Sequence, residues 1–396
     1  MESKKVIKIE DRKLSLTVII PQYNEKESEV IELLDSINMQ RGISFEDIRV
    51  LMINDNNPSG KISDEIINRY KKLNIKYLTT PKNAGPGQTR QFGIDNCETD
   101  YLIFADADDG FYSCDVFTKI YGVIEQYKAE NKVLDIIYSK WIEELLTDNA
   151  YVQIPHTPDA TWVHGKVFRT KYLTDNNIRF NPKIRLHEDS YFNIIAQMNT
   201  QNVASIDDYT YYWKWNENSL TRQTKYKYHY LVDTVDDLVV SIDDAMEQLI
   251  ARNTKGREEY VVKGIFFMYY ILQAPYWNIP NDKELSERRY IFERNIYNLI
   301  MKYNDAFRIP QETLFKYKGE ERAQCLQNTG FLDEVETWEQ FVKRLRQTFD
   351  PKPGANNCTN CKHFIDSTTK CPFAGVCEST IGEDNVLSTP TNWEAK

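Results

Sequence analysis

The sequence predicts an α/β domain with a mixed, mostly parallel sheet, followed by an α-helical domain and a small cysteine-rich tail. In the first half, short β-branched apolar runs alternate with segments whose apolar residues have helical spacing. The second half shows helical spacing alone, and four of the seven cysteines lie after residue 351. The predicted domains span residues 1–224, 225–350 and 351–396.

Four apolar runs in the first domain are predicted strands, at residues 16–20, 48–53, 75–78 and 101–104. Apolar residues with helical spacing follow the first strand at Val30, Leu33, Leu34 and Ile37, and the second at Ile62, Ile66, Ile67 and Tyr70. Because strands and helices alternate with short connections, these strands are expected to run parallel.

The pattern changes further along the chain. Residues 135–222 form a mixed segment rich in aromatic residues. A helical stripe then spans residues 231–249, and the aspartates between its apolar positions are expected to form a solvated face. Further helices are predicted at residues 261–272, 285–301 and 338–349. Two prolines and a glycine at 351–354 indicate a linker before the tail.

Composition is that of an ordinary globular protein. The 396 residues include 41% hydrophobic and 27% charged residues, with a formal net charge of −10. This charge argues against a broad nucleic-acid or anionic-membrane surface, although a local basic groove remains compatible with it. The charged amino terminus lacks the apolar core of a signal peptide, and no run is long enough to span a bilayer. A cytoplasmic protein is expected.

Three aspartates follow directly on the fourth predicted strand. They are Asp106, Asp108 and Asp109, and such close carboxylates repel one another unless a cation neutralises them. Hard oxygen ligands suit Mg²⁺ or Mn²⁺, particularly an ion shared with substrate phosphates. A solvated turn with a helix cap is the alternative, and Asp109 is expected to be such a cap.

Polar clusters also follow the earlier strands. In parallel sheets ligands bind beyond the carboxyl ends of the strands, where residues 21–25 and 54–59 are expected. A glycine-containing loop at residues 81–93 permits close backbone approach, and its helix would bring Arg90 near a phosphate. Ordinary turns and loops are the alternative for each cluster.

The order of these motifs resembles the family-2 glycosyltransferases with the GT-A fold, which have a Rossmann-like sheet. The resemblance covers residues 14–222, with Asn54 in place of the first member of the family's acidic pair. Six motifs carry it: Pro21, Tyr23 and Asn24; Asp55; Asn83, Gly85 and Arg90; Asp106 and Asp108; Gly165-Lys166 with Asn177 to Phe180 and His187-Glu188-Asp189; and the segment from Tyr211 to Ser219 and Arg222.

The resemblance implies an inverting transfer of a sugar from a nucleotide-sugar, a UDP-sugar by analogy, to a hydroxyl acceptor. Asp189 would be the base and Glu188 would orient the acceptor. Mn²⁺ or Mg²⁺ would be held by Asp108, with Asp106 sharing the metal or facing the ribose. The implied donor-binding residues are Pro21, Tyr23, Asn24, Asp55, Asn83, Gly85, Arg90 and Asp106.

The acceptor side is less specified. A surface glycan or polyol polymer and a modified DNA base are both compatible acceptors, and the helical domain would shape this side or an oligomer contact. Trp162, Trp213 and Trp215 would stack on sugars or belong to the core. Candidate acceptor or diphosphate contacts are His164, Lys166, His187, Ser219 and Arg222.

The tail has the residues of a structural zinc site. A segment with so little apolar material gains stability from four thiolates around Zn²⁺, with His363 as an alternative ligand. Free thiols, a disulfide or a partner-binding knuckle are the alternatives. The four predicted ligands are Cys358, Cys361, Cys371 and Cys377.

A second function class stays open on the sequence alone. The chain would then be a non-catalytic module that binds a nucleotide through its sheet and a partner through its helices and zinc knuckle. The joint presence of the Asp106–Asp108 and Glu188–Asp189 pairs favours the enzyme.

Overall fold

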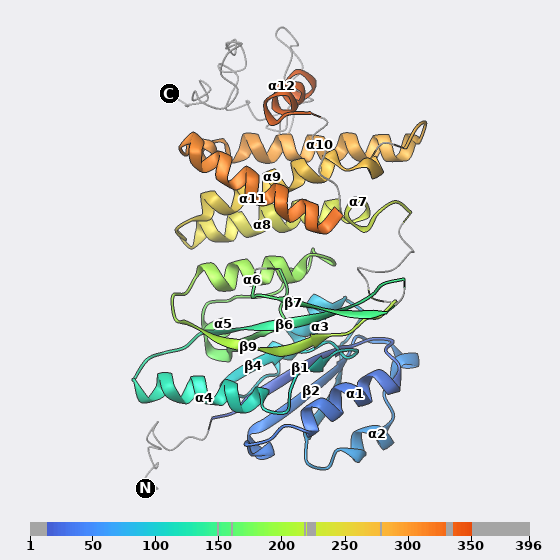
Figure 1. Cartoon of the computed structure of the whole chain (residues 1–396), viewed down its shortest axis with the longest axis vertical. Coiled ribbons are helices and arrows are strands. Elements are labelled where there is room, and N and C mark those ends of the chain that lie inside the picture. Colours follow the sequence, from blue (N-terminus) through green and yellow to red (C-terminus); the bar gives the residue numbers. More distant parts are fainter. Residues whose placement is uncertain are drawn as a thin grey trace, which may run out of the picture. The chain divides into compact units, whose positions relative to one another are not determined.

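The computed structural model describes residues 14–148, 150–159, 161–217, 219, 227–277, 279–329 and 336–350, with side chains described up to residue 326 in the penultimate range. The chain folds as two compact units, Met1–Lys225 and Tyr226–Lys396 (Figure 1). The first holds the sheet and the second is helical. The predicted cysteine tail lies outside the described residues.

Nine strands form one sheet in the described part of unit 1, in the order β3-β2-β1-β4-β8-β6-β9-β5, with β7 beside β6. Their bounds are β1 Leu16–Gln22, β2 Ile48–Asn54, β3 Asn74–Thr79, β4 Tyr101–Phe104, β5 Gly110–Phe111, β6 Ile136–Leu146, β7 Tyr151–His156, β8 Lys166–Arg169 and β9 Val203–Trp213.

The sheet is mixed, as predicted, but its pairing is parallel mainly in the first half. The expectation that most of the sheet is parallel was therefore wrong. The strands β1 to β4 pair in parallel, as expected. Beyond β4, strand β8 runs antiparallel to both β4 and β6, and β7 and β5 are also antiparallel to their partners. Antiparallel pairing allows short connections, and a hairpin indeed joins β6 to β7. Only β6 and β9 pair in parallel here.

The helices of unit 1 pack on a sheet whose first strand is buried along its whole length. Ile62 and Tyr70 are buried as predicted but flank α2, which is shorter than the predicted helix. The elements are α1 Glu27–Asn38, α2 Asp64–Arg69, α3 Pro86–Asp95, α4 Val116–Ala129, α5 Thr170–Asp175 and α6 Glu188–Met198, with short 3-10 turns at Phe45–Asp47 and Pro58–Gly60.

Strand register places the polar loops at one edge of the sheet. Gln22 is opposite Asn54, and Asn54 is opposite Thr79, so the loops that follow β1, β2 and β3 begin at the same level. Ile19 is opposite Phe104 at the end of β4. The residues that follow these four strands therefore share the carboxyl edge on which ligands bind in such sheets.

Unit 2 is built from helices around its own core. The predicted stripe at 231–249 is divided at Thr234 into two helices, and α9 has more buried residues than α8 or α10. The elements are α7 Tyr230–Asp233, α8 Val235–Ala251, α9 Arg257–Gln273, α10 Lys283–Lys302, α11 Gln311–Thr329 and α12 Trp338–Phe349, with 3-10 turns at Pro275–Trp277 and Asn304–Phe307.

Helix α11 was not predicted from the sequence. Its apolar residues do not form one stripe: Phe315 is 64% exposed, whereas Tyr317 and Cys325 are buried. Without a continuous apolar face the periodicity signal is absent, and packing on α9 supplies the stability instead.

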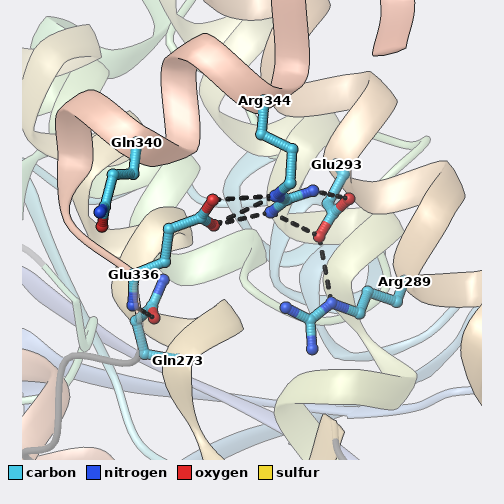
Figure 2. A pocket seen from close by; sticks show the side chains of 6 residues that line it. All are labelled: Gln273, Arg289, Glu293, Glu336, Gln340 and Arg344. Carbon is cyan, nitrogen blue, oxygen red and sulfur yellow. Dashed lines mark hydrogen bonds and ion pairs between the residues drawn. The ribbon is translucent and has the colours of Figure 1, made fainter. Parts of the chain in front are cut away.

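An ion-pair network joins α12 to α10 in unit 2 (Figure 2). Arg344 of α12 donates to Glu293 of α10 and to Glu336 just before α12, each at 2.8 Å. Arg289 donates to the same Glu293 carboxylate at 3.1 Å. These residues line a cavity together with Gln273 and Gln340. Because the carboxylates and guanidinium groups are paired with one another, we interpret the residues around this cavity as a structural contact between helices. Among the described residues of either unit, no helix is long and apolar enough to cross a membrane.

Candidate active site

One buried arginine contacts three carboxylates at the carboxyl edge of the sheet. Arg90 lies in α3 and its side chain is 5% exposed. Its Nη2 lies 2.7 Å from Oδ1 of Asp106, which follows β4. Its Nη1 lies 3.0 Å from Glu188 Oε1 and 2.9 Å from Asp189 Oδ1, both in the first turn of α6. Residues from two predicted motifs therefore meet on the same side chain.

The glycine-containing loop makes this meeting possible. Gly85 precedes α3 with φ of 85°, a conformation that glycine adopts without steric cost, and Pro86 opens the helix. A Cβ atom at Gly87 would lie 2.7 Å from Cγ of Glu188. The amino ends of α3 and α6 are thus in van der Waals contact, which brings Arg90 within reach of both acids of α6.

The charges of this group perturb one another. Burial disfavours the guanidinium ion, but Asp106, Asp189 and Glu188 outweigh it and raise the pKa of Arg90. Burial, followed by the neighbouring Asp189, raises the pKa of Glu188 to about 8. Burial also raises the pKa of Asp189, although Arg90 acts in the opposite direction. At neutral pH Glu188 therefore holds a proton, and Arg90 favours the ionised form of Asp189.

The second acid of the Asp-x-Asp motif is held from β9. Asn216, just beyond that strand, donates to Oδ2 of Asp108 at 2.7 Å. Burial and the nearby Asp106 raise the pKa of Asp108. The backbone N–H of Asp106 donates to the hydroxyl of Tyr211 at 2.9 Å. Strand β9 and the residues after it therefore set the position of both acids.

Asp109 has a different role from the predicted helix cap, and that prediction was wrong. Its carboxylate accepts hydrogen bonds from the hydroxyl of Tyr211 at 2.6 Å and from the backbone N–H of Lys214 at 3.0 Å. It is 1% exposed, whereas α4 begins only after Asp115. A buried carboxylate needs hydrogen-bond donors, and β9 provides them from about a hundred residues away. Asp109 thus holds the end of β9 close to the Asp-x-Asp motif.

The fit of a divalent cation rests on charge. The carboxylates of Asp106, Glu188 and Asp189 contact the buried guanidinium group of Arg90, and those of Asp108 and Asp109 lie near Asp106. The described residues contain no cluster of three or more His, Cys, Asp or Glu that could hold a metal by themselves. Mg²⁺ and Mn²⁺ sites often use one or two carboxylates and complete their shell with substrate phosphates and water. Asp106 and Asp108 fit a shared site of this kind.

Glu25 is a further acid of this edge that the motif assignments left out. Its Oε2 accepts the backbone N–H of Tyr23 at 2.7 Å. Burial raises its pKa to about 6, and the charges of Asp108 and Asp106 add to this effect. The loop after β1 therefore faces the Asp-x-Asp motif.

Asp55 anchors the loop that leads into α3. Its carboxylate accepts the backbone N–H groups of Ala84 at 3.0 Å and Gly85 at 2.8 Å, and the hydroxyl of Thr80 at 3.1 Å. The side-chain amide of Asn83 donates to the backbone carbonyl of Asp55 at 3.2 Å. The predicted contacts of Asp55 and Asn83 with a nucleotide remain predictions.

The other predicted contacts lie in varied surroundings. Pro21 is buried at the end of β1, while Tyr23 and Asn24 are exposed. His187 caps α6 in a left-handed conformation with φ of 67°, and the N–H of Ser219 donates to the carbonyl of Asn216. Arg222 and the four cysteines of the tail, Cys358, Cys361, Cys371 and Cys377, lie outside the described residues.

His164 and Lys166 are buried, which argues against their predicted direct contact with substrate. His164 is 5% exposed and stacks on the ring of Tyr211, with centroids 4.7 Å apart. Burial holds its pKa well below the ordinary value, so the ring is neutral. Lys166 is 1% exposed, and its ammonium group donates to the carbonyl of Trp162.

Three residues that position the acids were not predicted to do so from the sequence: Tyr211, Asn216 and Val163. Tyr211 and Asn216 belong to the aromatic segment that carried the resemblance, which was the available signal. Val163 acts through its backbone N–H, which donates to Oδ2 of Asp189 at 3.3 Å. A backbone donor leaves no signature in side-chain patterns.

Comparison with known proteins identifies a family and relatives that are similar to part of this chain. Residues 17–181 match the family described as Glycosyl transferase family 2. The chain is 26% identical over 228 residues to the uncharacterized glycosyltransferase EpsJ of Bacillus subtilis, which covers 52% of this chain and 62% of that protein. It is 24% identical over 213 residues to the poly(ribitol-phosphate) beta-N-acetylglucosaminyltransferase TarS of Staphylococcus aureus, which covers 50% of this chain and 35% of TarS.

The fold is also shared with a solved structure. The crystal structure of Staphylococcus aureus TarS 1-349 in complex with UDP-GlcNAc has a TM-score of 0.55 and 16% identity, over 82% of this chain and 98% of that one. Residues 17–181 are thus similar to glycosyl transferase family 2, and the fold is a GT-A-like mixed sheet followed by a helical region. It spans less than two thirds of the length of both curated relatives named above.

Proposed function

We propose that the chain is an inverting glycosyltransferase that transfers a sugar from a UDP-sugar to a hydroxyl acceptor. The observation that carries this proposal is the double contact of Arg90, which joins Asp106 of the Asp-x-Asp motif to Asp189 of the Glu-Asp motif. One acid on the donor side and one base for the acceptor are thereby held at a fixed separation. The non-catalytic alternative gives no reason for a shared, buried counter-ion between the two motifs.

Asp189 is the proposed base in a single displacement. Its carboxylate takes the proton of the acceptor hydroxyl while the acceptor oxygen bonds to the anomeric carbon. The bond between that carbon and the diphosphate oxygen breaks at the same time, and the electron pair leaves with UDP. Arg90 favours the carboxylate form of Asp189 against the effect of burial, and the raised pKa of Glu188 favours a neutral side chain beside this base.

The leaving diphosphate would lie at the carboxyl edge of the sheet, where several carboxylates already contribute negative charge. Asp106 and Asp108 would hold Mg²⁺ or Mn²⁺ here, which would supply electrostatic stabilisation of the leaving group. Asn216 keeps Asp108 oriented toward this position, and Tyr211 fixes the backbone at Asp106. The open part of the Asp106 side chain, 38% exposed, is the accessible face of this pair.

For the substrates, UDP-GlcNAc and a polyol-phosphate polymer are the first candidates. TarS is named for transfer of N-acetylglucosamine to poly(ribitol-phosphate), and its structure holds UDP-GlcNAc. The net charge of −10 gives no support to a broad DNA-binding surface, so a modified DNA base is the less favoured acceptor. Structural zinc in the cysteine tail stays part of the proposal, and metal analysis of the purified chain tests it.

The test combines a donor and acceptor panel with one substitution. Release of UDP and the mass of the product are measured with several UDP-sugars against poly(ribitol-phosphate), poly(glycerol-phosphate) and DNA that carries hydroxymethylated bases. Asp189→Asn is expected to abolish transfer and to keep UDP binding, whereas Asp207→Asn, at an exposed surface ion pair, leaves both unchanged. Product on the DNA alone would replace the polyol acceptor. Full turnover by Asp189→Asn would exclude this base.

A further inference from the structure

We propose that Lys166 is a positioning residue for Asp189 and that it acts through the peptide bond between Trp162 and Val163. The inference rests on the proposed function of Asp189 as the base. It adds a second buried cation to the groups that act on Asp189, through the carboxylate oxygen that Arg90 does not contact. No sequence motif indicates this role, because the connection passes through the backbone.

Three contacts form the connection. The ammonium group of Lys166, the first residue of β8, donates to the carbonyl oxygen of Trp162. The N–H of Val163 belongs to the same peptide unit and donates to Oδ2 of Asp189 at 3.3 Å. The other oxygen, Oδ1, is 2.9 Å from Nη1 of Arg90. Each oxygen of the base is therefore held by a separate donor.

A hydrogen bond at one end of a peptide unit changes the polarisation of the group at its other end. When its carbonyl accepts a hydrogen bond from an ammonium ion, the amide is polarised and its N–H becomes a stronger donor. The effect is large where water is excluded, and Lys166 is 1% exposed. Lys166 thus stabilises the carboxylate form of Asp189 in two ways, by its field and through the N–H of Val163.

The loop that carries this peptide is fixed from several sides. The backbone N–H of Trp162 donates to Oδ1 of Asp159 at 3.2 Å, and the hydroxyl of Ser139 donates to the carbonyl of Gly165 at 2.8 Å. The ring of Trp162 is stacked with that of His164 at an angle of 10°. These contacts hold the loop in place, so removal of the Lys166 charge need not displace it.

The charged groups around the base come from four places. Arg90 of α3 and Lys166 of β8 lower the pKa of Asp189, whereas Asp106 after β4 raises it and Glu188 lies beside it in α6. Around Lys166 the acids are Asp159 and Asp189, and the neighbouring His164 is neutral. Burial lowers the pKa of Lys166 to about 8, which leaves it mostly charged at neutral pH.

The experiment is a pH profile of kcat/KM for wild type, Lys166→Met and Lys166→Arg. Loss of the charge in Lys166→Met is expected to move the acidic limb upward by about one pH unit. Because a shift of one unit changes the ionised fraction by at most tenfold, kcat/KM at pH 6.5 is expected to fall by up to about tenfold, with unchanged UDP affinity. Lys166→Arg keeps the charge and returns the limb toward its wild-type position. Lys119→Met, which removes a cation bound to Asp115 and Asp208 in the same unit, leaves the limb in place.

The outcomes separate this inference from the proposed function. A folded Lys166→Met enzyme with reduced rate but an unmoved acidic limb would show that Lys166 only fills space, and would overturn the inference. Should the methionine variant fail to fold, Lys166→Gln keeps a hydrogen-bond donor without charge and is expected to show the same upward shift. Full activity of Asp189→Asn would instead remove the base itself, whatever the Lys166 variants do.

Discussion

Nη1 of Arg90 lies 2.9 Å from Oδ1 of Asp189, although the two residues are 99 positions apart in the chain. The same guanidinium group reaches Oδ1 of Asp106 through Nη2. A single buried cation therefore sets the distance between Asp106, which follows β4, and Asp189 in the first turn of α6. This relationship determines which substitutions should affect the chemistry and which should affect the fold.

Removal of the Arg90 guanidinium should damage both stability and turnover. Arg90→Met leaves three carboxylates around an apolar side chain, and the loss of one partner from a buried ion pair typically costs about 3–5 kcal/mol. Denaturant unfolding measures this loss. Arg90→Lys keeps the charge but not the two-armed geometry, so we expect an intermediate stability and a kcat/KM reduced by about 100-fold. Wild-type kinetics in Arg90→Met would contradict the proposal that Arg90 holds Asp106 and Asp189 in position for the reaction.

Asp108 and Asp109 should separate metal binding from folding. Asp108→Asn is expected to weaken Mn²⁺ binding by about tenfold or more, measured from the EPR signal of free Mn²⁺, with little change in unfolding. Asp109→Ala removes the acceptor for Tyr211 and Lys214 and is expected to cost about 1–3 kcal/mol of stability. If Asp109→Ala loses Mn²⁺ as strongly as Asp108→Asn, the two roles are not distinct.

The contact between α3 and α6 should tolerate no side chain at Gly87. Its Cβ would lie 2.7 Å from Cγ of Glu188, so Gly87→Ala must move one helix against the other. Overpacking of this kind costs about 1–3 kcal/mol. The measurable results are a lower midpoint of thermal unfolding and a reduced kcat. Gly122→Ala is the matched control, because no atom lies within 4 Å of a Cβ at that position.

Glu188 should make the stability of the folded chain depend on pH. Its folded pKa of about 8 lies above its ordinary value of 4.5, so the folded chain keeps a proton that the unfolded chain loses between these values. This contribution is full below about pH 4.5 and is lost as the pH rises toward 8. Thermal unfolding at intervals from pH 5 to pH 8.5 should show a flatter profile for Glu188→Gln than for wild type. The exposed Glu98→Gln serves as the control.

Helix α12 should depend on the ion pairs of Arg344. Arg344→Met removes the donor shared by Glu293 and Glu336 and leaves both carboxylates near helix α10 without it. Since the arginine side chain is 36% exposed, solvent screens part of the loss, and we expect a destabilisation of about 1 kcal/mol. Limited proteolysis near residue 336 and denaturant unfolding measure it. An unchanged cleavage rate would show that apolar packing alone holds α12.

Much of the fold could be read from local patterns. The first four strands appear at continuous apolar runs, and most helices appear where apolar residues repeat with period 3.6, because burial of a strand or of one helix face selects apolar residues directly. Helix α11 escaped detection because its buried residues do not form a stripe. The antiparallel second half of the sheet escaped as well, since strand direction depends on how distant segments pair.

The sequence by itself determined the residue types of the site and their order along the chain. Carboxylates follow strands that end at one edge, which is compatible with a cation and a phosphate or with ordinary turns, and the resemblance in motif order favoured a nucleotide-sugar donor. Only the tertiary structure decided the partner of each acid. It placed Arg90 against carboxylates, Asp109 against Tyr211, and the buried Lys166 against the carbonyl of Trp162. The physical reason is desolvation: a buried charge must find a partner, and the available partners come from distant parts of the chain.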